Sequence, residues 1–162
     1  MIYNEALKIA NKYLELLRPH CDRIEIAGSI RRKKPEVKDI EIVCIPKPYE
    51  TGLFESGIAM VVNTLEKVKG ELPCKYTQRI LPEGIKLDLF FAEYGNWGLI
   101  YAIRTGSAEY SHKVLANGWV KRGYKSIDGF LTYNGKQILV PKEEQLFSRI
   151  GLPFVEPENR NL

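Results

Sequence analysis

The sequence lacks the features of a membrane protein and of a disulfide-stabilised protein. No apolar stretch is long enough to cross a bilayer. Because the first residues already follow an amphipathic pattern, we expect no signal peptide. Cysteine is scarce. The chain has three cysteines, Cys21, Cys44 and Cys74, which is an odd number, and their spacing is not that of a metal site. We therefore expect buried thiols and a reducing, cytoplasmic compartment.

Histidine and net charge are also low. The two histidines, His20 and His112, have no metal-ligand spacing, and the 162 residues carry a net charge of only +4. This charge alone does not separate a solvated surface from a surface for an anionic partner such as nucleic acid. The hydrophobic fraction of 44% is typical of a globular domain with a core of its own.

Hydrophobic periodicity predicts an α+β fold. Helical spacing is found over residues 4–17, 58–68, 96–101, 107–118 and 143–150. Strand-like patterns occur at residues 23–27, 39–45, 74–81, 85–91, 130–133 and 136–140. We expect Asn4 to cap the first helix, residues 46–57 to form a loop, and Asn134-Gly135 to form a hairpin turn. This order of helices and strands indicates a central mixed β-sheet flanked by helices.

The most informative stretch is residues 28–43, GSIRRKKPEVKDIEIV. Its Gly28-Ser29 turn and the basic residues after it are suited to binding phosphate through backbone N–H groups and cations. In the strand that follows, Asp39 and Glu41 are two residues apart and therefore project from one face, while isoleucines face the core. Two adjacent carboxylates repel each other unless a cation such as Mg²⁺ neutralises them.

A third carboxylate, Asp88, lies within the apolar strand predicted at residues 85–91. Aspartate is disfavoured in strands, and its usual place there would be a solvent-facing position. A phosphate cradle beside three carboxylates is also the layout of two-metal nucleotidyl transfer. In that chemistry Asp39 and Glu41 would bridge two ions, and Asp88 would hold the ion on the hydroxyl side.

These motifs resemble the DNA polymerase beta-like, or family X, nucleotidyltransferases. Gly28-Ser29, Arg31-Arg32 and Asp39-Ile40-Glu41 are similar to the family's GS-x-RR…D-x-D signature. Further similar segments lie at residues 87–89, 104–107, 129–136, 143–147 and 151–158. The resemblance covers nearly the whole chain.

The resemblance implies a nucleotidyltransferase palm at residues 1–95 and a small C-terminal helix/hairpin subdomain at residues 96–162 that binds the nascent base pair. It implies a minimal member without the N-terminal lyase domain. Catalysis would use Asp39, Glu41 and Asp88 as ligands of two Mg²⁺ or Mn²⁺ ions. The residues that it assigns to the nucleotide are Gly28, Ser29, Arg32, Lys38, Arg104, Gly106 and Ser111.

The chain departs from the family pattern at several of these positions. Glu41 stands in place of an aspartate, Lys38 in place of a frequent glycine, and Ser111 in place of an asparagine that contacts the incoming base. Ile103 and Arg104 replace an aromatic pair that, in the family, excludes the 2′-hydroxyl of the sugar. Preference between deoxyribonucleotides and ribonucleotides is therefore open.

Three functions are compatible with the sequence. The preferred one is a template-dependent repair polymerase that uses nucleoside triphosphates on gapped or primer-template DNA, with a helper protein as a possible partner. The second is a nucleotidyltransferase acting on RNA or another hydroxyl acceptor, which Ile103 and Arg104 favour. The third is a catalytically weakened nucleic-acid-binding module, of which Glu41 and Lys38 would be signs.

Overall fold

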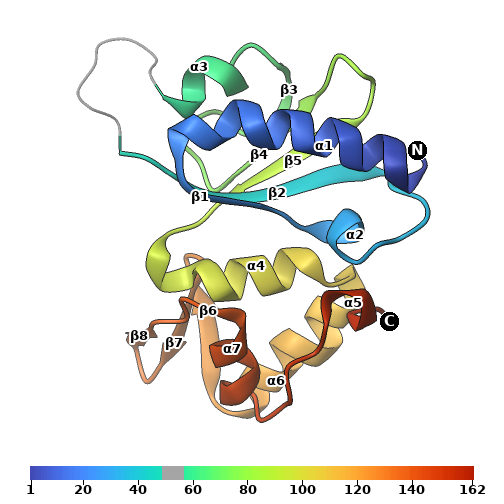
Figure 1. Ribbon diagram of the computed structural model, residues 1–162. Coiled ribbons are helices and arrows are strands. Elements are labelled where there is room, and N and C mark those ends of the chain that lie inside the picture. The colour runs from blue at the N-terminus through green and yellow to red at the C-terminus, as the bar shows by residue number, and fades with distance from the viewer. Residues whose placement is uncertain (49–56) are drawn as a thin grey trace. The chain divides into compact units, whose positions relative to one another are not determined.

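The computed structural model describes residues 1–48 and 57–162 (Figure 1). The chain forms two compact units, Met1–Phe91 and Ala92–Leu162. Most of the loop expected at residues 46–57 lies outside the described residues. Within them, no helix has the length and apolar character needed to span a membrane.

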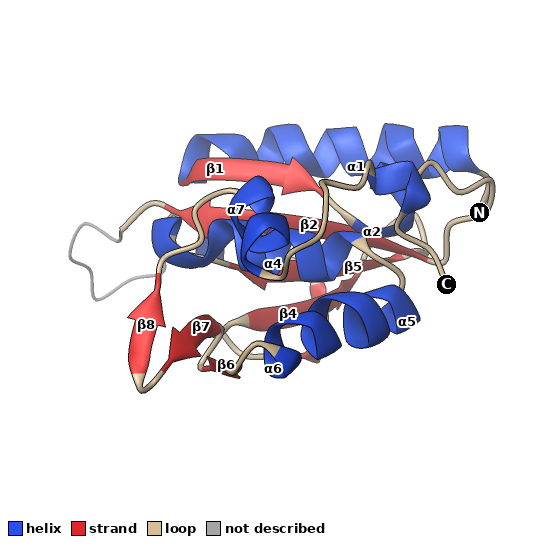
Figure 2. Cartoon of the chain, turned by 90° about the horizontal axis from the view of Figure 1, so that it is seen from below, coloured by secondary structure: helices blue, strands red, loops and turns tan. Residues whose placement is uncertain are grey.

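The first unit is built on a five-stranded mixed sheet. Its elements are α1 (Tyr3–Leu17), η1 (Arg18–His20), β1 (Cys21–Ile26), α2 (Gly28–Arg31), β2 (Asp39–Pro46), α3 (Ile58–Val62), β3 (Glu66–Lys69), β4 (Tyr76–Ile80) and β5 (Lys86–Phe91). The strand order is β1-β2-β5-β4-β3, and its first four strands lie side by side in Figure 2. Among the neighbouring strands of this sheet, β2 and β5 run parallel to each other, and the other three pairs are antiparallel. The predicted central mixed sheet is confirmed.

One face of this sheet packs against α1 and α3. Ile40 and Ile42 of β2 and Leu87 and Leu89 of β5 are fully buried in one cluster with apolar residues of both helices. Because successive side chains alternate between faces, the residues between these four lie on the opposite face. The apolar packing thus fixes where the acidic side chains of β2 and β5 point.

Two sequence predictions in this unit are wrong. Asn4 does not cap α1, which starts one residue earlier, after Ile2, and has no side-chain cap. The helix predicted at residues 58–68 ends at Val62, and β3 follows it instead. The periodic apolar residues continue past Val62, but pairing of β3 with β4 outweighs the helical pattern there.

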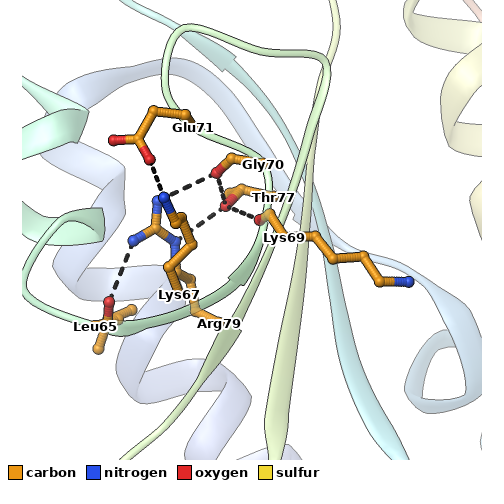
Figure 3. A network of polar contacts seen from close by, with 7 residues as sticks. All are labelled: Leu65, Lys67, Lys69, Gly70, Glu71, Thr77 and Arg79. Carbon is orange, nitrogen blue, oxygen red and sulfur yellow. Dashed lines mark hydrogen bonds and ion pairs between the residues drawn. The ribbon is translucent and has the colours of Figure 1, made fainter.

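Buried polar contacts hold the connection between β3 and β4 (Figure 3). The guanidinium of Arg79, a residue that is 3% exposed, donates to the carbonyls of Leu65 and Gly70 and to Thr77 Oγ1. The Thr77 hydroxyl is also within hydrogen-bond distance of the Gly70 carbonyl, at 2.8 Å. These contacts satisfy carbonyl groups that a tight strand connection leaves unpaired.

The second unit combines short helices with a three-stranded sheet. Its elements are η2 (Tyr94–Asn96), α4 (Trp97–Thr105), α5 (Ala108–Tyr110), the π-helical η3 (Ser111–Ala116), α6 (Asn117–Lys121), β6 (Tyr124–Ile127), β7 (Phe130–Tyr133), β8 (Lys136–Ile138), α7 (Glu143–Arg149) and η4 (Pro157–Asn159). The hairpin predicted around Asn134-Gly135 is confirmed, with positive φ at both residues. Strand β6 was not predicted, because its residues are largely exposed and lack alternation.

The second unit has a core of its own. Leu99, Leu115, Leu131 and Leu146 are fully buried in one cluster. Beside it, the buried Arg160 pairs with Glu143, and its guanidinium lies 5.1 Å from the ring centres of both Phe147 and Phe154. This ion pair joins the end of the chain to α7.

Candidate active site

The central pair of strands brings the three predicted carboxylates together. Glu41 and Asp88 are direct partners in the parallel β2–β5 ladder, and Asp39 lies two residues before Glu41 on the same face. Ile40, which lies between Asp39 and Glu41, and Leu87, which precedes Asp88, are fully buried on the other face. Three acidic side chains from two separate segments therefore share one face of the sheet.

Glu41 is held against the turn that follows β1. Its carboxylate accepts a hydrogen bond from the Ser29 backbone N–H. Gly28 lies directly beneath it with a φ of +61°, and a Cβ at this position would stand only 1.5 Å from Glu41 Oε2. Gly28 thus provides both a backbone conformation and a space that other residues do not.

The electrostatics of the face favour the protonated forms of Glu41 and Asp39. Burial and the charge of Asp88 raise the pKa of Glu41 to about 7, although Arg32 and the Ser29 N–H act in the opposite direction. Burial and Asp88 also raise the pKa of Asp39, against the effect of Lys86 and Lys38. Such mutual repulsion is relieved when a cation lies among the carboxylates.

Asp88 is 8% exposed and is held by the neighbouring strand β4. The Tyr76 hydroxyl donates to Asp88 Oδ1 at 2.6 Å, and the Gln78 side-chain amide donates to the same oxygen at 2.8 Å. Gln78 is the direct partner of Asp88 in the β4–β5 ladder. Both donors come from β4, and the spacing of residues in the sequence does not show that this strand reaches the site.

A cavity of about 540 Å³ adjoins two of the carboxylates. Its lining residues are Ser29, Arg32, Lys34, Pro35, Glu36, Lys38, Asp39 and Glu41. Three of them are cations and three are anions, a mixture suited to a polyanionic ligand that arrives with metal ions. Of the predicted nucleotide-binding residues in the first unit, Ser29, Arg32 and Lys38 line this cavity, and Gly28 lies beneath Glu41.

The donor set fits Mg²⁺ or Mn²⁺ in its chemistry, since carboxylate oxygens are the ligands that these hard ions prefer. In the part of the chain that the structure describes, however, no three acidic, histidine or cysteine side chains form a closed metal-binding group.

The remaining predicted nucleotide-binding residues belong to the second unit. Arg104 is exposed near the end of α4. Gly106 follows that helix, and a Cβ there would lie 2.8 Å from the Tyr110 ring and 2.9 Å from Ser111 Oγ. The Ser111 hydroxyl donates to the Ile103 carbonyl at 2.7 Å, so its proton is used within the unit.

Comparison with known proteins identifies the fold. Neither a protein-family model nor a curated protein matches the sequence. The chain is similar to the crystal structure of Leishmania infantum polymerase beta in a ternary P/T complex, with a TM-score of 0.74 and 18% sequence identity. The similarity covers 100% of this chain and 77% of that chain. At this identity the similarity shows the fold, and it confirms the predicted α+β class with a polymerase beta-like nucleotidyltransferase fold.

Proposed function

We propose that this chain transfers a nucleotidyl group from a nucleoside triphosphate to a 3′-hydroxyl, as a minimal family X-like repair DNA polymerase. The main support is the shared face of Asp39, Glu41 and Asp88, next to a cavity lined by Arg32 and Lys38. The polymerase beta-like fold supports the same class of reaction. Gapped or primer-template DNA is the proposed partner, alone or with a helper protein.

In this reaction the 3′-oxygen attacks the α-phosphorus, the bond to the bridging oxygen breaks, and pyrophosphate leaves. Two Mg²⁺ or Mn²⁺ ions, when bound, lower the pKa of the attacking hydroxyl and stabilise the leaving oxygen. Asp39 and Glu41 would hold both ions. Asp88 would hold the ion on the hydroxyl side and accept the proton of the attacking group.

The cations of the cavity would bind the triphosphate. Arg32 presents a planar fork of donors that matches two phosphate oxygens, and Lys38 contributes a mobile point charge. The Ser29 N–H is the group for which Glu41 and a phosphate oxygen would compete. Triphosphate binding would therefore leave the Glu41 carboxylate free to bind metal.

Extension of a labelled primer across a short DNA gap tests the proposal, with Mg²⁺ and Mn²⁺ in parallel. We expect product from the wild type and a loss of about 10³-fold or more in Asp39→Ala, since a lost metal ligand removes several kcal/mol of transition-state stabilisation. Equal product from both proteins, or none from the wild type, would contradict the proposal. Metal and triphosphate binding without product would favour the binding module.

A second candidate is transfer to RNA or to another hydroxyl acceptor. It is favoured by Ile103, which packs partly buried against the core of the second unit, and by the exposed Arg104 beside it. Neither side chain supplies the flat aromatic surface that the family uses against the 2′-hydroxyl. Incorporation of ribonucleotides as fast as deoxyribonucleotides, or without a template, would favour this candidate.

A further inference from the structure

Strand β4 contributes two side chains to the acidic face. Tyr76, Gln78 and Ile80 alternate with buried residues along β4, and Gln78 stands directly opposite Asp88. The two donors from Tyr76 and Gln78 both reach Oδ1 of Asp88. Within the described residues, Oδ2 of this carboxylate accepts no hydrogen bond from the protein.

We propose that Tyr76 and Gln78 are positioning residues that orient the Asp88 carboxylate so that Oδ2 is available to a metal ion. This inference rests on the proposed nucleotidyl transfer. The terminal torsion of an aspartate is broad, so a single strand position does not determine where its two oxygens point. Two donors on one oxygen remove this freedom, as outer hydrogen bonds do for metal-binding side chains in general.

Both donors are supported by neighbouring residues. The Tyr76 ring stacks on Phe90, the next residue on the same face of β5, with ring centres 4.9 Å apart and planes 17° from parallel. The backbone of Gln78 is held in the ladder directly opposite Asp88. On the opposite face of β4, Thr77 and Arg79 form the buried contacts that join this strand to the β3–β4 connection (Figure 3). Asp88 is thus oriented by a strand that is anchored from its other side.

A purely structural role would be the alternative, because any buried carboxylate needs donors. The two roles predict different results. A structural role predicts that loss of a donor lowers stability and leaves metal binding unchanged. A positioning role predicts weaker metal binding and slower chemistry at an unchanged affinity for the triphosphate.

Tyr76→Phe is the main test variant, because it keeps the ring that stacks on Phe90 and removes only the hydroxyl. Tyr13→Phe is its matched control, since it removes another tyrosine hydroxyl that donates to a carboxylate of the same unit, Glu83, at 2.7 Å. Gln78→Leu removes the second donor. All are compared with the wild type by thermal unfolding to verify folding.

The first readout is Mn²⁺ binding, followed by electron paramagnetic resonance in the presence of a non-hydrolysable nucleoside triphosphate. We expect Tyr76→Phe and Gln78→Leu each to weaken it by about tenfold, and Tyr13→Phe to leave it unchanged. In gap filling, kcat should fall by a similar factor, with KM for the triphosphate within about twofold of the wild type. Saturating metal should restore part of the lost rate.

A double-mutant cycle gives the second readout. In the Asp88→Asn background, adding Tyr76→Phe should not weaken Mn²⁺ binding further, because the group that it orients no longer ligates the metal. Metal affinity and kcat at the wild-type level in a folded Tyr76→Phe would overturn the inference, even if stability fell. A wild type that neither binds Mn²⁺ with triphosphate nor extends a primer would instead contradict the proposed function.

Discussion

At the scale of single residues, Glu41 depends on the turn that follows β1. Its carboxylate accepts a hydrogen bond from the Ser29 N–H, and the absence of a side chain at Gly28 leaves room for the carboxylate.

Glu41→Asp should bind nucleoside triphosphate more tightly than the wild type. The shorter side chain frees the Ser29 N–H for a phosphate oxygen, and one hydrogen bond of this kind contributes about 1 kcal/mol, or a few-fold in Kd. Titration with a fluorescent triphosphate analogue in the absence of metal measures the change. Glu41→Gln, which keeps the length of the side chain, is the control for charge. Weaker binding by Glu41→Asp than by the wild type would show that Glu41 and phosphate do not compete for the Ser29 N–H.

At the scale of secondary-structure elements, the connection between β3 and β4 depends on Arg79. Arg79→Met keeps the length of the side chain but leaves the Leu65 carbonyl without its donor and the Gly70 carbonyl with only the Thr77 hydroxyl. We expect a loss of about 1–3 kcal/mol in the free energy of unfolding, with faster amide exchange in β3. Chemical denaturation and hydrogen exchange measure the two effects. Lys67→Met is the control, because the pair of Lys67 with Glu71 is exposed to solvent and contributes little to stability. Equal losses in the two variants would rule out a special role of Arg79.

Helix α1 is joined to the turn between β4 and β5 through a hydrogen bond that responds to pH. Burial and the carboxylate of Glu83, which accepts from the Tyr13 hydroxyl, raise the pKa of Tyr13 to about 12. Because this pKa is higher in the folded state than the ordinary value of 10, the contribution to stability is complete below pH 10 and is lost as pH rises toward 12. The stability difference between wild type and Tyr13→Phe should therefore shrink over that interval.

Urea denaturation at several pH values between 9 and 12 gives this difference, at intervals of about half a unit. Tyr94→Phe serves as the control, because Tyr94 is 74% exposed. A difference between wild type and Tyr13→Phe that stayed constant over the whole interval would mean that the hydroxyl titrates alike in the folded and unfolded states.

The sequence predicted elements best where local chemistry determines them. Alternation fixed the acidic face of β2, and Asn134-Gly135 fixed the β7–β8 hairpin. Strands β3 and β6 were missed, since each is exposed and exists through its pairing partner. The contribution of Tyr76 and Gln78 was missed for a related reason: residue spacing shows which face a side chain shares, but only the register of β4 against β5 shows which acid it meets.

At the scale of the whole molecule, the two units have separate hydrophobic cores. Arg160→Ala tests whether the cores also unfold separately. The substitution removes the cation that pairs with the buried Glu143, which should cost about 3–5 kcal/mol. We expect hydrogen exchange to accelerate at core amides of the second unit, such as Leu99 and Leu131, while Ile42 and Leu87 in the first unit keep their protection.

Arg149→Ala, at an exposed position of α7, is the control for this experiment. It should leave exchange in both units unchanged. Equal acceleration in both units by Arg160→Ala would show that the chain unfolds as one cooperative body, although its cores are distinct.

The parallel ladder between β2 and β5 also has a consequence for how the protein acquires its site. Glu41 and Asp88 meet only after the chain has passed through α3, β3 and β4, so their pairing closes a long loop and joins distant parts of the sequence. Such pairings are slow to form, because the entropy of loop closure is lost before the contacts are gained. The acidic face should therefore assemble late during refolding, after the helices and local hairpins. A chain released early from the ribosome would contain Asp39 and Glu41 but no site.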